Sequence, residues 1–130
     1  MLRHEVTHLN EPLFAIKKEI HDSAPEWMQA AIRRSTVRVT DTRRGHASFR
    51  RKTATVPLWA WNKGHDFTHY YLAHELAHLV TRSSGHGPEF QSALARLTPF
   101  AYFELGYRPK SAKAAGITAP EGAALVQMKA

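Results

Sequence analysis

The first third of the chain carries apolar residues at helical spacing. Between Glu11 and His21 they recur every three or four positions, which predicts a helix with one buried face. A second helix is expected to follow, with Ser23 as its N-cap, Pro25 in its first turn and Glu26 completing a capping box. The side chains expected in the two buried faces are Leu13, Phe14, Ile16 and Ile20, then Trp27, Met28, Ala31 and Ile32.

A period of two replaces the helical period at Thr36. Valines alternate there with polar residues up to position 40, as in a half-buried strand. Two further extended stretches are expected, from His46 to about Lys52 and from Thr53 to Trp59. Because Pro57 has no N–H for a sheet hydrogen bond, the last stretch is expected to lie at an edge of the sheet or to end there. The pattern therefore predicts a small sheet of two or three strands.

Two more helices are predicted in the second half of the chain. Asp66 or Thr68 can cap a long helix that reaches about Thr81, and a Ser-Ser-Gly segment then ends it. Pro88 opens the next helix, because the N–H that proline lacks has no intrahelical partner in the first turn. The residues expected on the inner face of this helix are Phe90, Ala93, Leu94 and Leu97.

These elements predict an α+β fold, with N-terminal helices, a small sheet, a long helix and a following helix. The length of 130 residues allows one compact domain, which we expect to span residues 1–109. From about residue 110 onward Ala, Lys, Gly and Ser predominate, so residues 110–130 are expected to form a loosely packed tail.

The composition excludes several classes of protein. The chain has no cysteine, which excludes disulfides, thiolate catalysis and a cysteine-based zinc ribbon. It has no run of eighteen apolar residues and no apolar stretch behind its first charged residues, so neither a membrane span nor a secretory signal is expected. A cytoplasmic protein is the simplest interpretation.

Residues 74–78 read His-Glu-Leu-Ala-His, the H-E-x-x-H pattern, inside the long predicted helix. Positions four apart lie on one face of a helix, so His74 and His78 can bind one cation. Glu75 lies at the edge of that face, where a carboxylate can take a proton from a water activated by Zn²⁺. In a chain with nine histidines the pattern also arises by chance, as two partly exposed histidines on the polar face of an amphipathic helix.

A catalytic zinc site has three protein ligands and one open position. His86 lies at the predicted turn between two helices, eight residues after His78, where it can return to the metal. Glu89 is the alternative third ligand, although a carboxylate in the first turn of a helix is equally explained by the helix dipole. His69 falls on the leucine side of its helix and is expected to be a core residue.

Together with Gly-His-Gly-Pro-Glu-Phe at residues 85–90, the H-E-x-x-H segment resembles the SprT-like zinc metallopeptidases, a group of zincins. The resemblance is strong over residues 70–97 and implies a zincin-like fold. It implies that Zn²⁺ is bound by His74, His78 and His86. It also implies that Glu75 is the general base. Many members of that family carry a zinc ribbon, which this cysteine-free chain cannot form, so the chain resembles a minimal catalytic domain of a bacterium or bacteriophage.

The resemblance implies hydrolysis of peptide bonds in a protein or peptide substrate. Zincin sheets commonly bind the substrate as an added strand, and the stretch from Thr53 to Trp59 is the candidate edge. The group that stabilises the oxyanion is left open among Tyr70, Tyr71, Tyr102 and Tyr107, most of which are expected to pack in the core.

The net charge of +7 comes from one segment, because residues 33–52 hold eight lysines and arginines against one aspartate. Such a segment attracts polyanions, and contact with DNA is an interpretation that the family resemblance supports. An acidic protein substrate or a solvated face explains the same charge. The residues expected to contact nucleic acid are Arg43, Arg44, Arg50, Arg51 and Lys52, with the aromatic residues Phe49, Trp59 and Trp61 nearby.

Three hypotheses follow from these patterns. The leading one is a zinc-dependent peptidase, with DNA-associated proteins among its candidate substrates. The alternative is a nucleic-acid-binding module in which zinc has a structural, non-catalytic role. The third is a helical interaction protein that binds no metal.

Overall fold

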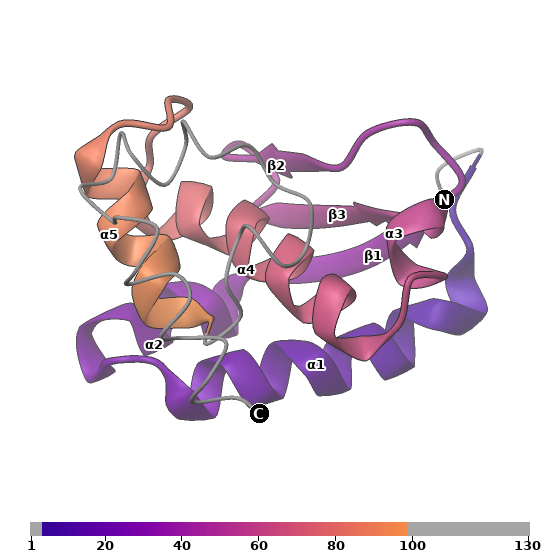
Figure 1. Cartoon of the computed structure of the whole chain (residues 1–130), viewed down its shortest axis with the longest axis horizontal. Helices are drawn as coiled ribbons and strands as arrows, with labels where there is room; N and C mark the ends of the chain where they lie inside the picture. The colour runs from indigo at the N-terminus through magenta and orange to yellow at the C-terminus, as the bar shows by residue number, and fades with distance from the viewer. Residues whose placement is uncertain (1–3, 99–130) are drawn as a thin grey trace.

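The structure, a computed structural model, describes residues 4–98 of the chain. These residues form an α+β fold, as predicted, with a three-stranded mixed sheet (Figure 1). The helices are the 3₁₀ helix η1 (Thr7–Leu9) and the α-helices α1 (Asn10–Ser23), α2 (Glu26–Arg34), α3 (Leu58–Trp61), α4 (His65–Thr81) and α5 (Pro88–Leu97). The strands are β1 (Thr36–Thr40), β2 (His46–Ser48) and β3 (Thr53–Pro57). The predicted tail over residues 110–130 lies outside the described residues.

Helix α4 is the central element of the fold. It packs against the sheet through β3 and β2, against α5, and against α1 and α2. Figure 1 shows it crossing the middle of the molecule, with α1 below it and α5 beside it. Eleven of its 17 residues are buried, and its alanines and leucines at positions 72, 73, 76 and 77 are fully enclosed. This packing fixes the helix, and with it every side chain that the helix presents.

The strand order is β1-β3-β2, so β3 is the central strand. It pairs parallel with β1 and antiparallel with β2, and Val39 and Val56, which are register partners, are both fully buried. The expectation that Thr53 to Trp59 forms an edge strand is therefore wrong, whereas the alternative, that the strand ends at Pro57, is confirmed. Pro57 is compatible with the central position because it is the last residue of β3, after which the chain turns into α3.

Among the described residues, the strand with an open edge is β2. It is shorter than predicted, because residues 49–52 form a turn. The outer edge of β1 is covered by the N-terminal segment, where Val6 N donates to Val39 O at 2.8 Å and Asp41 N donates to His4 O at 2.8 Å. Within residues 4–98, no strand pairs with the outer edge of β2.

The predicted helix caps are wrong in both places. Ser23 closes α1 instead of capping α2, and its hydroxyl donates to Glu19 O at 3.1 Å. Helix α2 begins after Pro25, without a side-chain cap. Helix α4 begins after Gly64, and the Thr68 hydroxyl donates back to the Gly64 carbonyl at 2.8 Å. Both hydroxyls thus bond to a carbonyl four residues earlier, which competes with capping.

The predicted buried faces are largely confirmed. Leu13, Ile16, Ile20, Met28 and Ile32 are buried, as are Phe90, Ala93, Leu94 and Leu97 of α5. Phe14 and Trp27, however, are 56% and 67% exposed. Phe14 follows the buried Leu13, and Trp27 precedes the buried Met28. Adjacent residues of a helix point about 100° apart, so only one side chain of each pair can face the core. No described helix combines the length and apolarity that crossing a bilayer requires.

The loop that leads into β2 is held at two points. Trp59 Nε1 donates to Arg43 O at 2.8 Å, and Gly45 N donates to the Tyr71 hydroxyl oxygen at 2.8 Å. A Cβ at Gly45 would collide with the Tyr71 ring and would lie 2.5 Å from Thr55 O. Only glycine lets the loop approach α4 and β3 this closely.

We therefore expect Gly45→Ala to lower the free energy of unfolding by about 1–3 kcal/mol, because either the ring or the strand backbone must move. Urea denaturation measures this. The control is Gly85→Ala, whose new Cβ would meet only Ser83 Oγ at 3.8 Å and should change stability by less than about 0.5 kcal/mol. Equal stability of the two variants would show that the loop is not held against Tyr71.

Candidate metal centre

The H-E-x-x-H motif lies on α4, as predicted, with its two histidines one turn apart. The ring centroids of His74 and His78 are 5.2 Å apart. His78 and Glu75 are each only 7% exposed, so this face of α4 is largely covered. His69, expected in the core, is buried. The opposite face of α4 is enclosed by the core, so the helix cannot turn about its axis. The side chains of the motif therefore stay on this face.

His86 reaches the same place through the loop over residues 82–87. Arg82 ends α4 in the left-handed conformation, with a φ of 55°, and the chain reverses there. Ser83 N then donates back to His78 O at 3.3 Å. From its buried position in α5, Gln91 Nε2 donates to His86 O at 3.4 Å. The loop is thus tied to both helices that it connects.

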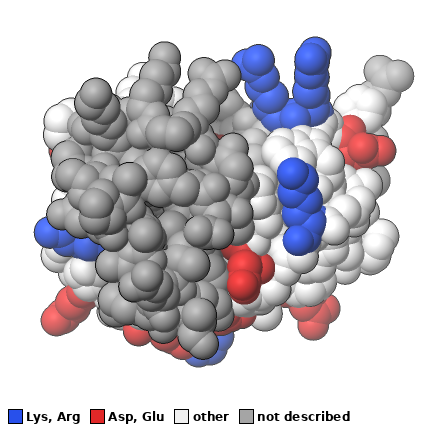
Figure 2. Space-filling model, viewed as in Figure 1, with Lys and Arg blue, Asp and Glu red and all other residues white. Residues whose placement is uncertain are grey.

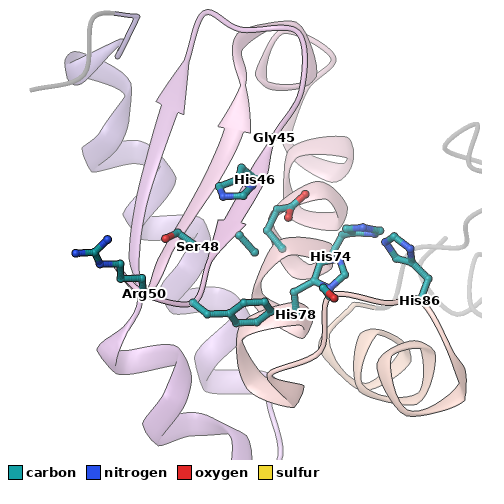
Figure 3. A pocket seen from close by; sticks show the side chains of 11 residues that line it. Gly45, His46, Ser48, Arg50, His74, His78 and His86 are labelled. Carbon is teal, nitrogen blue, oxygen red and sulfur yellow. The ribbon is translucent and has the colours of Figure 1, made fainter.

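The three imidazoles face one another at one end of a cavity (Figure 3). The His86 ring centroid lies 5.1 Å from that of His74 and 4.8 Å from that of His78. One nitrogen of each ring lies within 4.8 Å of the others. Zinc–nitrogen bonds are about 2.0–2.1 Å long, so small side-chain rotations bring the three nitrogens onto one ion. No other cluster of potential metal ligands occurs in the part of the chain that the structure describes.

A hydrogen bond from the loop orients His78. Its Nδ1 lies 2.7 Å from Ser83 O. A carbonyl oxygen only accepts, so Nδ1 carries the proton and Nε2 keeps its lone pair. Histidines that bind metals commonly donate their other N–H to a backbone carbonyl in this way. The loop that brings His86 to the cluster therefore also sets the tautomer of His78.

Phe90 is the apolar residue on which the three imidazoles pack. Its ring centroid lies 4.9 Å from that of His74, 4.3 Å from that of His78 and 5.0 Å from that of His86. Phe90 is 1% exposed, so it closes the protein side of the cluster. The sequence indicates its burial in α5 but not this shared contact, which depends on how α5 packs against α4.

The environment favours neutral imidazoles. Burial lowers the pKa of His74 to about 3, with smaller contributions from His78 and His86. Burial also lowers the pKa of His78, opposed by its hydrogen bond to Ser83. Because a histidine binds metal in its neutral form, both residues are ready for a cation at neutral pH. The residues present therefore fit a zinc ion in their chemistry and in their arrangement.

Glu75 is a buried carboxyl group beside this cluster. Burial raises its pKa to about 8. A cation at the histidines would oppose this shift, because an opposite charge favours the carboxylate. A general base works best when its pKa lies near the working pH, and burial moves the pKa of Glu75 in that direction.

A cavity of about 620 Å³ is lined by residues of α4 and of β2. His74, Glu75, His78 and His86 line one side of it. The segment from Gly45 to Arg50 lines the other, and Figure 3 shows His46 and Ser48 of β2 opposite the cluster. The sequence indicates no role for His46, because the residues of a short strand do not show which helix packs beside it.

Other candidates from the sequence lie elsewhere. Glu89 is exposed and lines a different hollow, so the structure does not bring it to the three histidines. Tyr70 and Tyr71 are buried and do not line the cavity. The Tyr71 hydroxyl instead accepts the backbone hydrogen bond described above. Tyr102 and Tyr107 lie outside the described residues.

The basic residues predicted to contact nucleic acid lie at the two ends of β2. Arg43 and Arg44 are in the loop before it, and Arg50, Arg51 and Lys52 are in the turn after it. All five are exposed, and Arg50 lines the cavity. Figure 2 shows lysine and arginine side chains projecting from the upper edge of the molecule, the side on which the loop between β1 and β2 runs in Figure 1. The charge therefore flanks the open strand.

Comparison of the chain with models of protein families, with curated proteins and with solved structures finds no match. The likeness to the SprT-like peptidases accordingly rests on the motif residues themselves. The fold is described by its helices and strands alone, as an α+β arrangement around α4 and a three-stranded mixed sheet.

His86 and Glu89 offer a direct test of the ligand set. We expect His86→Ala to weaken zinc binding by at least about 100-fold, since even the loss of a residue that only supports a metal ligand costs 10–100-fold. Glu89→Ala should keep the zinc affinity of the wild type. Competition with a chromophoric chelator, together with metal analysis after dialysis, measures both. The reverse pattern would move the third ligand to Glu89.

Glu75 makes the stability of the metal-free protein depend on pH. Its pKa is about 8 in the folded state and near 4.5 when exposed, so the native state retains a proton that the unfolded state releases. Its contribution to stability therefore falls as the pH rises from about 4.5 to 8. Glu75→Gln removes the titrating carboxyl group and with it this loss of stability at high pH. We expect the substitution to stabilise the metal-free protein by a few kcal/mol more at pH 8 than at pH 5.

Urea denaturation of the metal-free protein at both pH values measures the difference. Glu89→Gln makes the same chemical change at an exposed site and should show no such pH dependence. A stabilisation by Glu75→Gln that is equal at pH 5 and pH 8 would contradict the raised pKa.

Proposed function

We propose that the protein is a zinc-dependent metallopeptidase with a zincin-like site. The observation that carries the proposal is the meeting of three histidine nitrogens within 4.8 Å, beside a buried glutamate, in a cavity bordered by an open strand. His74, His78 and His86 would hold the ion. The match of their positions to the H-E-x-x-H and Gly-His-Gly-Pro-Glu-Phe segments supports the same activity.

Bound zinc supplies a Lewis acid that lowers the pKa of water to near 7. Glu75 is the base in the proposed reaction: its carboxylate takes a proton from the attacking water and then gives it to the amine of the leaving peptide. The burial of Glu75 supports this role, because a carboxyl group with a raised pKa can both accept and return a proton near neutral pH. Ser83 and Phe90 act as positioning residues, through their contacts with the histidines.

The substrate backbone is proposed to lie along the outer edge of β2. Unpaired N–H and C=O groups of an edge strand can bind an extended peptide as a further strand. This edge borders the cavity that contains Glu75, so a peptide paired with it would present its carbonyl groups there. It replaces the edge expected from the sequence, since β3 is enclosed between its neighbours.

His46 is the proposed partner of the oxyanion. It lies on β2 and lines the cavity opposite the cluster, where a ring N–H can point at the reacting carbonyl. It is also close enough to lower the pKa of His78 through its charge. The tyrosines considered from the sequence are less suitable, because neither Tyr70 nor Tyr71 lines the cavity.

DNA-associated proteins remain among the proposed substrates, because exposed cations flank β2. The same cations support the alternative, a nucleic-acid-binding module with a structural zinc. The two functions differ in Glu75: an enzyme needs its carboxylate, whereas a structural zinc site does not.

Glu75→Gln separates these functions. In the enzyme, loss of the general base should lower kcat for an unfolded protein substrate at least about 100-fold, while zinc content and the circular dichroism spectrum stay unchanged. Glu89→Gln is the matched control and should retain full activity. The assay follows the fragmentation of casein with zinc-loaded protein, with and without single-stranded DNA.

Two results would contradict the proposal. One is a wild type that cleaves no substrate under any of these conditions while binding zinc and DNA, which is the outcome for a structural zinc. The other is cleavage by Glu75→Gln at the rate of the wild type, which would trace the activity to a different site or to a contaminant.

A further inference from the structure

A second hollow, of about 250 Å³, lies beside the metal cavity. Three of its lining residues are cations, Arg34, Lys52 and Arg82. Its apolar walls come from Phe49, Leu79 and Val80. Phe49 lines the metal cavity as well, so the two hollows meet at this side chain.

The three cations reach the hollow from separate elements. Arg34 is the last residue of α2, Lys52 ends the turn between β2 and β3, and Arg82 follows α4. None of the three forms an ion pair with any of residues 4–98. The fold thus gathers three positive charges around one space that no described carboxylate lines, although Arg82 also borders the hollow that Glu89 lines.

Two of these residues occupy unfavourable backbone conformations. Lys52 has a φ of 51° and Arg82 a φ of 55°, and they are the two non-glycine residues with positive φ within residues 4–98. Left-handed backbone costs an ordinary residue about 1–2 kcal/mol and is usually taken by glycine or asparagine. Both left-handed positions carry a long cationic side chain, and both border the same hollow.

The hollow lies next to the end of β2. Phe49 directly follows Ser48, the last residue of β2. Because Phe49 lines both hollows, a peptide that pairs with β2 and continues past Ser48 would reach this one. A peptide side chain can enter it while the peptide backbone stays on the strand.

We propose that this hollow is a subsite for an acidic side chain of the peptide substrate, a glutamate or an aspartate. The carboxylate would bind Arg34, Lys52 and Arg82, and its aliphatic stem would contact Phe49, Leu79 and Val80. The inference rests on the proposed peptidase function. A peptide is favoured over a nucleic acid because Phe49, which directly follows β2, lines the hollow and because the hollow has apolar walls.

The test measures peptide binding without turnover. Zinc-loaded Glu75→Gln protein is titrated into fluorescein-labelled ten-residue peptides that carry three glutamates in the N-terminal half, in the C-terminal half or nowhere, with glutamine as the replacement. Fluorescence anisotropy gives the dissociation constants. We expect one of the two glutamate peptides to bind on the order of tenfold more tightly than the glutamine peptide, with the preference weakening as salt is added.

The variant that tests the hollow is Lys52→Asn combined with Arg82→Asn, in the same background. Asparagine suits left-handed backbone, so the double variant should fold with at least the thermal stability of its parent. It should lose the preference for glutamate while binding the glutamine peptide as before. Lys18→Gln, which removes an exposed cation on α1, is the control and should keep the preference.

Equal binding of the glutamate and glutamine peptides would overturn the proposal, and so would a preference that survives in the double variant. A twelve-residue dT oligonucleotide is titrated in parallel. If the double variant loses only affinity for this oligonucleotide, the hollow is a nucleic-acid contact and the peptide subsite is wrong.

The same peptides separate this inference from the proposed function. If the wild type cleaves glutamate and glutamine peptides with equal kcat/KM, the peptidase stands and the subsite fails. If it cleaves neither while the binding preference persists and is lost in the double variant, the subsite stands and the peptidase proposal fails.

Discussion

The burial of α4 determines the geometry of the candidate site. A helix enclosed by the sheet, α5, α1 and α2 cannot turn about its axis, because rotation would expose leucines and bury polar groups. His74, Glu75 and His78 are therefore held on the side that faces the cavity. Their burial keeps the imidazoles neutral and disfavours the carboxylate, so packing also sets the protonation of the site.

The loop over residues 82–87 and helix α5 supply the remaining contacts of the histidine cluster. The loop delivers His86 and, through Ser83 O, orients His78. Phe90 packs against all three imidazoles, so the apolar face of α5 serves the core and the cluster together. The contacts of His86 with Gln91 and Phe90 give this loop residue a defined position. The left-handed Arg82 that makes this reversal possible also carries one of the cations of the second hollow.

The sequence predicted those parts of the site that depend on local spacing. Helical geometry alone places His74, Glu75 and His78 together, and the Pro88 start places His86 in a turn. The edge strand was predicted wrongly, because the order of strands depends on pairings distant in sequence, and Pro57 is tolerated at the end of a central strand. The positions of His46 across the cavity and of Phe90 against the imidazoles were not predicted, for a similar reason. Each position depends on how two elements pack together, and the pattern of residues within one element does not predict that contact.

We propose that three histidines hold one zinc ion and leave a coordination position to water. X-ray absorption spectroscopy at the zinc edge of the loaded protein tests it most directly. We expect a first shell of three imidazole nitrogens and one further light atom, with distances of about 2.0–2.1 Å, and replacement of that atom by added hydroxamate. A shell of four protein donors that hydroxamate leaves unchanged, or a shell with only two imidazoles, would contradict it.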